Sequence, residues 1–156
     1  LITHYKLSEG MKVLDIGCAK GFLLKDLMQT LHGLEGFGID ISEYAIKNSV
    51  KEMIGRLHHG NAINLPFPDN SFDLVLSINT LHNLEKSEIK IALQEIMRVS
   101  KGSAYVVVDS YLNEQDKLIF EEWVLTARYH NYPREWKILF DEAGYTGDYS
   151  WTFINN

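Results

Sequence analysis

Short apolar segments alternate with amphipathic segments over the first two thirds of the chain, and this alternation restricts the fold more than any other feature. Strands are predicted over 11–16, 36–40, 57–59, 72–78 and 105–108. Between them, apolar residues recur at helical spacing, as at Leu24, Leu27, Met28 and Leu31, at Ile46 and Val50 after a capping Ser42, and at Ile89, Ala92, Leu93 and Ile96. Such alternation predicts an α/β fold, with parallel strands and helices on both faces of the sheet.

The last third of the chain carries weaker signals. Asn113 is a candidate N-cap for a helix that reaches Trp123. A second helix is predicted to begin at Pro133 and to end at Gly144, with an apolar face made of Trp136, Leu139, Phe140 and Ala143. Aromatic and hydroxyl side chains alternate over 149–153, which predicts a half-buried strand.

Length and charge restrict the class of protein. The 156 residues fit one domain, 1–156, and the net charge of −6, with no basic cluster, argues against a nucleic-acid partner. A single cysteine, Cys18, excludes an internal disulfide framework and predicts a cytoplasmic location. No apolar run is long enough to span a membrane, and no signal segment opens the chain. The first residue is Leu1 and not Met, so a trimmed amino terminus stays open as an alternative.

Candidate binding residues follow three of the predicted strands, where open α/β sheets bind their ligands. The first strand runs into a loop of small residues, 15–21, whose backbone can approach a ligand closely. Asp40 ends the second strand, where a carboxylate can bind both hydroxyls of a ribose. Asn61 follows the third strand and can face an adenine edge. Taken singly, the loop is also a plain turn, Asp40 a helix cap and Asn61 a turn former, but the three in this order favour a nucleoside cofactor.

The residues that carry these features resemble the class I S-adenosylmethionine-dependent methyltransferase family, in its small-molecule branch. The resemblance runs over most of the chain, through VLDIGCAKG at 13–21, GIDIS at 38–42, GNA at 60–62, LPFPDNSFDLV at 65–75 and EIMRV at 95–99. It implies a doubly wound, mostly parallel sheet with helices on both faces and the strand order 3-2-1-4-5 plus a C-terminal strand. It also implies S-adenosyl-L-methionine as cofactor and methyl transfer to a small molecule as the reaction.

The resemblance also implies residue roles. The first loop would hold the methionine part of the cofactor, through Asp15, Gly17, Cys18, Ala19 and Gly21. Asp40 would bind the ribose, Ile41 would lie against the adenine, and Asn61 with the backbone of Ala62 would meet the adenine edge. Asn79, just after the fourth strand, would line the pocket near the methionine end.

Two departures from the family pattern affect this site. Ala19 replaces the usual middle glycine, so a positive φ there would cost energy, and Asn61 replaces the usual aspartate. A nicotinamide dinucleotide is the rival cofactor. Its G-x-G-x-x-G pattern would fall on Gly17, Ala19 and Phe22, which matches at one glycine only, so an NAD-dependent oxidoreductase is the weaker interpretation.

The sequence identifies the catalytic residues less clearly than the cofactor-binding residues. Alignment of donor and acceptor supplies most of the catalysis of such a transfer, so the reaction does not depend on one characteristic side chain. His82 is a candidate general base or a helix cap, and Asp109 a candidate pocket carboxylate or a turn cap. Aromatic and basic residues in the last third are candidates for an acceptor pocket: Trp123, Arg128, Tyr129 and His130. His58 and His59 have no neighbouring ligands, so no metal is expected.

A second class of function stays open at this point, a methyltransferase-like domain that binds cofactor or a partner without turnover. It rests on the short segment before the first strand and on the few residues after Phe153, where a last antiparallel strand would be expected. The oligomeric state is not predicted.

Overall fold

The central element of the molecule is a six-stranded parallel sheet. The computed structural model describes residues 1–153. The strands are β1 (Lys12–Ile16), β2 (Glu35–Asp40), β3 (Leu57–His59), β4 (Leu74–Ile78), β5 (Ala104–Ser110) and β6 (Asp148–Phe153). Their order is β3-β2-β1-β4-β5-β6, and each neighbouring pair is parallel. This confirms the predicted doubly wound sheet with a C-terminal strand beside β5.

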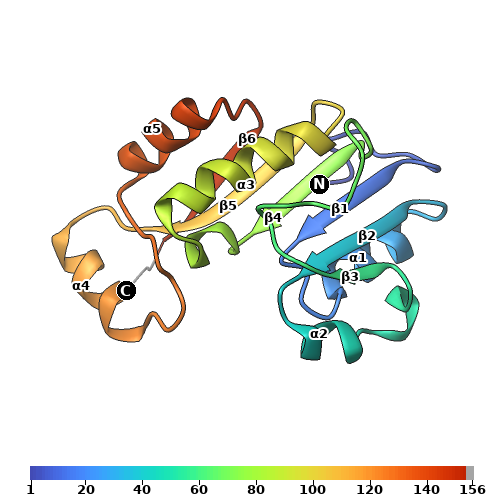
Figure 1. Cartoon of the computed structure of the whole chain (residues 1–156), viewed down its shortest axis with the longest axis horizontal. Coiled ribbons are helices and arrows are strands. Elements are labelled where there is room, and N and C mark those ends of the chain that lie inside the picture. The colour runs from blue at the N-terminus through green and yellow to red at the C-terminus, as the bar shows by residue number, and fades with distance from the viewer. Residues whose placement is uncertain (154–156) are drawn as a thin grey trace.

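Helices cover both faces of this sheet (Figure 1). They are α1 (Phe22–Thr30), α2 (Glu43–Lys47), α3 (Lys86–Val99), α4 (Glu114–Trp123) and α5 (Pro133–Ala143), with 3₁₀ turns η1 (Lys51–Met53) and η2 (Leu81–Asn83). α1 lies on one face, whereas α3 and α5 lie together on the other, and α4 projects beyond the end of β5 (Figure 1). No helix within residues 1–153 is long and apolar enough to cross a membrane.

The prediction was wrong about the extent of the second helix. α2 ends at Lys47, and Val50, expected on its inner face, instead precedes η1. The backbone N–H of Val50 donates to the carbonyl of Lys20 at 3.0 Å, so it bonds to the loop after β1 and not to a helical carbonyl. This tertiary hydrogen bond draws the chain out of the helix and ties the end of α2 to the loop.

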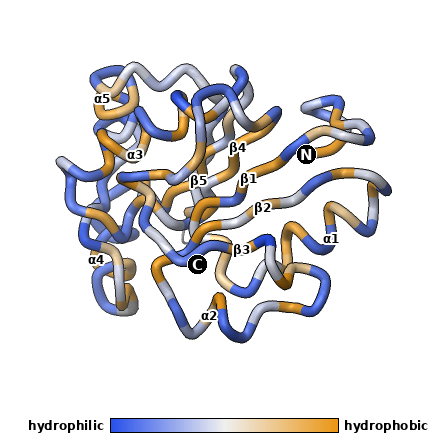
Figure 2. Tube along the Cα trace, turned by 45° about the vertical axis from the view of Figure 1, so that its right-hand side comes forward, coloured by the Kyte–Doolittle hydropathy of each residue, from blue (hydrophilic) through white to orange (hydrophobic). Residues whose placement is uncertain are grey.

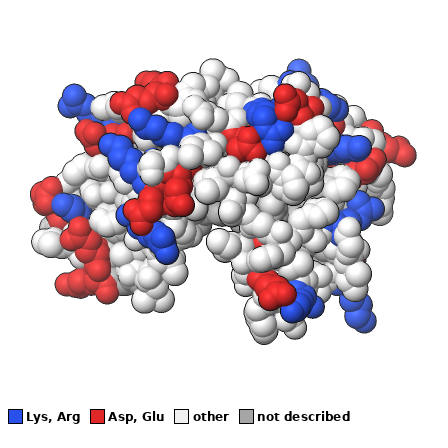
Figure 3. All heavy atoms as spheres, in the orientation of Figure 1, with Lys and Arg blue, Asp and Glu red and all other residues white. Residues whose placement is uncertain are grey.

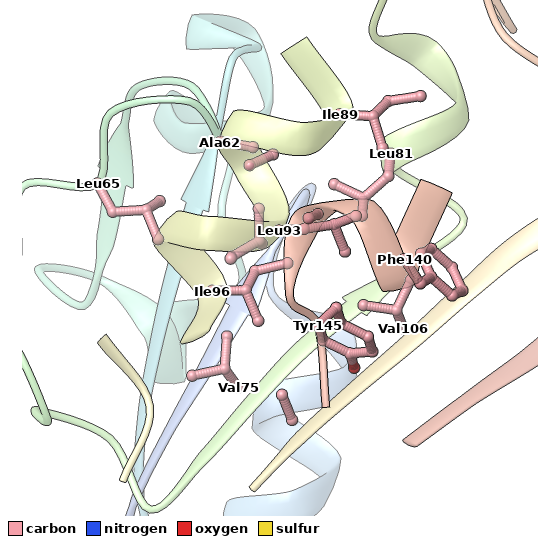
Figure 4. Packing of buried hydrophobic residues seen from close by; sticks show 14 of the residues in the cluster. Ala62, Leu65, Val75, Leu81, Ile89, Leu93, Ile96, Val106, Phe140 and Tyr145 are labelled. Carbon is pink, nitrogen blue, oxygen red and sulfur yellow. The ribbon is translucent and has the colours of Figure 1, made fainter. Parts of the chain in front are cut away.

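Two apolar clusters form the core, one on each face of the sheet. Side chains alternate between faces along a strand, so Leu14 and Ile16 of β1 join the cluster with α3 and α5, whereas Val13 joins the cluster with α1. Figure 2 shows hydrophobic residues along β1, β4 and β5, as expected of strands covered on both faces. Figure 4 shows how residues of α3, α5 and the sheet interdigitate in the larger cluster.

The predicted ends of the later helices are confirmed. Asn113 caps α4, because its side chain accepts a hydrogen bond from the backbone N–H of Asp116 at 2.9 Å. Gly144 ends α5 with a left-handed φ of 72°, which glycine adopts without strain. β6 is partly exposed, as its alternating sequence predicts.

Candidate functional site

A cavity of about 270 Å³ lies at the carboxyl ends of β1, β2, β3 and β4. Figure 3 shows the surface hollowed between the parts that carry α2 and α4, at this edge of the sheet. Parallel strands bring their ends to one edge, so residues far apart in the sequence meet there. The cavity is lined by Ile16, Gly17, Ile39, Asp40, Ile41, Gly60, Asn61, Ala62, Asn79, Thr80, Asn83 and Leu84.

The backbone of Gly17 is tightly enclosed at the start of the loop after β1. Its φ is 80°, and an added Cβ would lie 2.0 Å from Oγ1 of Thr80. Its N–H donates to the carbonyl of Ile39 at 2.8 Å, which fixes the loop against β2. Only glycine fits this position, both for its positive φ and for its lack of a side chain.

Asp40 connects this loop with the start of α2. One carboxylate oxygen accepts from the N–H of Ala19 at 2.8 Å, and the other accepts from the N–H of Ser42 at 2.8 Å. The helix cap is Ser42, whose hydroxyl accepts from the N–H of Ala45. Each oxygen of Asp40 keeps a second lone pair, so the carboxylate can still accept hydrogen bonds from a ligand in the cavity.

Ala19 adopts the positive φ that its replacement of glycine makes unfavourable. Its φ is 47°, in the left-handed region where a Cβ costs about 1–2 kcal/mol. The hydrogen bond from its N–H to Asp40 helps to hold this conformation. Strained backbone of this kind is typical of ligand-binding loops.

Four of the residues expected to bind cofactor are absent from the described lining of the cavity: Asp15, Cys18, Ala19 and Gly21. The side chain of Cys18 instead lies in the core cluster below α1, where burial raises the pKa of its thiol to about 12. Gly21 is the N-cap of α1, and an added Cβ would lie 2.8 Å from Cγ of Met53. Its small size therefore serves close packing of the chain.

Asp15 is a buried carboxyl group beneath the cavity. It is 5% exposed, and burial, reinforced by the charge of Asp40, raises its pKa to about 7. A carboxyl that ionises near neutral pH stores unfavourable electrostatic energy when charged. The sequence pattern identified this residue but gave no sign of its protonation.

The opposite wall of the cavity comes from the segments after β2, β3 and β4. Ile41 is 72% exposed, and its carbonyl is 3.1 Å from Nε2 of His59. Asn79 has a φ of 53°, and its side-chain oxygen accepts from the hydroxyl of Thr152 on β6 at 3.0 Å. Sequence reasoning missed the roles of Thr80, Asn83 and Leu84, although their position directly after a buried strand was a usable signal.

His82 and Asp109 lie together beside the cavity, although neither belongs to its described lining. Nδ1 of His82 accepts from the backbone N–H of Asp109 at 3.3 Å and lies 3.5 Å from a carboxylate oxygen of the same residue. The neutral ring that accepts at Nδ1 carries its proton on Nε2. Burial lowers the pKa of His82, opposed in part by Asp109, and burial raises the pKa of Asp109.

The helix-cap interpretation of His82 is wrong. α3 is capped by a reciprocal pair, in which Glu85 accepts from the backbone at Glu88 and Glu88 accepts from the N–H of Glu85 at 2.9 Å. The carbonyl of His82 accepts instead from the N–H groups of Arg128 and Tyr129, at 2.8 and 3.1 Å. His82 therefore joins the end of β4 to the segment between α4 and α5.

The candidate acceptor residues of the last third are largely packed against aromatic neighbours. Tyr129 meets Trp136 edge-on, with ring centroids 4.8 Å apart, and His130 lies 5.1 Å from the ring of Phe120. Arg128 extends to Glu85, at 3.6 Å. The side chain of Trp123 lies outside the described part of the chain. Within that part, no group of three or more His, Cys, Asp or Glu side chains is placed to hold a metal ion.

Comparison with known proteins identifies the family. Residues 14–108, more than half of the chain, match the family model for a methyltransferase domain. The demethylmenaquinone methyltransferase of Geobacillus stearothermophilus is 36% identical over 115 residues, 69% of this chain and 48% of that protein. The rat protein named arginine-hydroxylase NDUFAF5, mitochondrial, is 38% identical over 95 residues, 60% of this chain and 27% of that protein. The chain thus spans less than half the length of these two relatives.

Solved structures agree with this assignment. A SAM-dependent methyltransferase from Aquifex aeolicus superposes with a TM-score of 0.66 and 27% identity, covering 92% of this chain and 76% of that one. A methyltransferase from Haloferax volcanii, solved in complex with the activator Trm112, gives a TM-score of 0.74 and 26% identity, covering 91% of this chain and 66% of that one. Sequence motifs, strand order and these matches together place the chain in the class I S-adenosylmethionine-dependent methyltransferase family.

Proposed function

We propose that this chain binds S-adenosylmethionine in the cavity at the ends of β1 to β4 and transfers its methyl group to an uncharged small molecule. The observation that carries the proposal is the convergence of Gly17 and Asp40 on one cavity. An enclosed glycine backbone and a carboxylate with spare lone pairs are the groups needed to hold an amino-acid moiety and a ribose.

The remaining lining fits the other parts of the cofactor. Asn61 and Ala62 would meet the adenine edge, and the exposed side chain of Ile41 would cover the adenine face. Asn79 and Thr80 would lie beside the methionine end, next to Gly17. Bound cofactor supplies an already activated sulfonium methyl group. The work left to the protein is to align the acceptor with that methyl and to exclude water.

Asp109 is the better candidate for a general base, and His82 its positioning partner. A base needs a free lone pair, but Nδ1 of His82 is occupied by the N–H of Asp109. Asp109 retains a carboxylate whose pKa is raised by burial, which brings its basicity closer to neutral pH. His82 lies between the cavity residues Thr80 and Asn83 in sequence, so the pair is adjacent to the cofactor site.

The proposed acceptor is uncharged and largely apolar. Relatives bear the names demethylmenaquinone methyltransferase, phthiotriol/phenolphthiotriol dimycocerosates methyltransferase 1 and sterol 24-C-methyltransferase. These names refer to apolar acceptors and support the same class here, in contrast with the arginine named for the rat relative.

Binding and transfer are tested in sequence. Calorimetry with S-adenosylhomocysteine, S-adenosylmethionine and NADH should give binding of the first two only. Radiolabelled methyl donor is then offered with a prenylated quinol, a sterol and an arginine-containing peptide. Label in an apolar acceptor supports the proposal, whereas label in the peptide alone overturns the acceptor class. Cofactor binding without transfer to any acceptor in an extended metabolite panel favours the alternative, a binding domain without turnover.

A further inference from the structure

The loop that follows β3 is held by side chains of α3 that lie outside the lining of the cavity. Residues 60–69 form no helix or strand, so their backbone groups lack the partners that regular structure supplies. Two side chains of α3 provide hydrogen-bond partners for the backbone of Leu65. The N–H of Leu65 donates to Glu95 at 2.8 Å, and the carbonyl of Leu65 accepts from Arg98 at 3.0 Å.

Arg98 uses its whole guanidinium group in this support. Its Nε and Nη2 donate to the two carboxylate oxygens of Glu95, at 2.6 and 2.8 Å. Its Nη1 donates to the carbonyl of Phe67 and to the carboxylate of Asp69, both at 2.8 Å. With the bond to Leu65, the five hydrogen bonds match the five N–H donors of an arginine. Lysine has three donors on a single atom and cannot reproduce this planar arrangement.

The supported loop leads directly to the cavity. Asn61 and Ala62, which line the cavity, precede Leu65 by four and three residues. Ala62 and Leu65 are both buried in the core cluster that contains α3 (Figure 4). At its other end the loop is tied to β2, because the N–H of Gly60 donates to the carbonyl of Asp40 at 3.0 Å. The segment that carries Asn61 is therefore short and fixed at both ends.

We infer that Glu95 and Arg98 are positioning residues for the adenine end of the cofactor: they hold the loop through Leu65 and Phe67 and so preorganise Asn61 and Ala62. The inference rests on the proposed placement of adenine against these two residues. Without the support, the loop would have to be ordered on each binding event, and the entropy of ordering would be subtracted from the affinity.

The test compares Arg98→Met with Lys90→Met. Both residues lie on α3 and form ion pairs, but Lys90 pairs with Glu142 of α5 and does not support the loop. Calorimetry measures the affinities of S-adenosylhomocysteine, adenosine and inosine. Arg98→Met should weaken binding of S-adenosylhomocysteine and of adenosine roughly tenfold, and it should reduce the preference for adenosine over inosine. Lys90→Met should leave these affinities and this preference unchanged. Hydrogen exchange should accelerate at the Leu65 amide in Arg98→Met.

Arg98→Lys provides a variant that keeps the positive charge if Arg98→Met does not fold. It should lose affinity for adenosine in the same direction, because one ammonium cannot reach Glu95, Leu65 and Phe67 together. Folded Arg98 variants with wild-type preference for adenosine over inosine would overturn the inference. Failure of the wild-type protein to bind adenosine or S-adenosylhomocysteine would instead overturn the proposed function.

Discussion

The carboxylate of Asp40 holds the backbone of Ala19, through a hydrogen bond of 2.8 Å from the N–H of Ala19. Ala19 has a φ of 47°, which a residue with a side chain adopts at a cost. The carboxylate thus has two tasks, to fix the strained loop and to present lone pairs to the cavity. Loop and ribose site are linked through one side chain.

Replacement of Asp40 should therefore affect binding more than folding. Two charge-assisted hydrogen bonds to ribose hydroxyls would contribute roughly 1.5–3 kcal/mol each before non-additivity. Asp40→Ala should weaken binding of S-adenosylhomocysteine at least about tenfold, measured by calorimetry, with native circular dichroism. Asp26→Ala, at an exposed position on α1, is the control. An unchanged dissociation constant in Asp40→Ala would show that the carboxylate only stabilises the loop at Ala19 and does not bind the ribose.

A side chain at Gly17 should disrupt the cavity. The new Cβ would overlap the side chain of Thr80, so Thr80 or the loop must move. Gly17→Ala should lower the affinity for S-adenosylhomocysteine, and Gly17→Val should abolish binding. Gly55→Ala is the matched control, because Gly55 has a similar φ of 79° but nothing within 4 Å of its added Cβ. Equal affinities in Gly17→Ala and Gly55→Ala would contradict a role for the enclosed backbone of Gly17 in binding.

Asp15 should make stability depend on pH in a predictable direction. Burial raises its pKa in the folded chain to about 7, above the ordinary 3.8 of an aspartate. A raised carboxyl pKa favours folding at low pH, and this contribution is lost as the pH rises from about 4 to 7. The stability of Asp15→Asn relative to wild type should therefore increase between pH 5 and pH 8, by up to a few kcal/mol on the order expected for such a shift. Urea unfolding at both pH values measures the difference, and a constant difference would contradict the prediction.

His82 should be neutral at pH 7 with its proton on Nε2. Burial lowers its pKa below the ordinary 6.5, and Nδ1 accepts from the N–H of Asp109. Stability from this depressed pKa is present above about 6.5 and is lost as the pH falls below the folded value. Nitrogen-15 NMR of the imidazole distinguishes the two tautomers. A proton on Nδ1 at pH 7 would restore His82 as the base and make Asp109 its orienting partner.

Much of the fold is encoded in local patterns of the sequence. Runs such as 74–76 and 106–108 are apolar at successive positions, as expected of strands covered on both faces, and helical spacing at Ile89, Leu93 and Ile96 defines α3. The start of α4 and the end of α5 could also be predicted from the sequence, because Asn113 and Gly144 cap these helices through residues close to them in the chain. Asp40 and Asn61 were found because a parallel sheet brings strand ends to one edge.

The interactions that define the site join distant parts of the chain and have no local signature. His82 and Asp109 are 27 positions apart, and Arg98 and Leu65 are 33 apart. The exclusion of a side chain at Gly17 comes from Thr80, on another strand end, and the protonation of Asp15 comes from its burial and from Asp40. Sequence periodicity specifies which face of an element is apolar. Which side chains meet, and how far their pKa values shift, is decided only when the packed sheet removes them from water and sets them against one another.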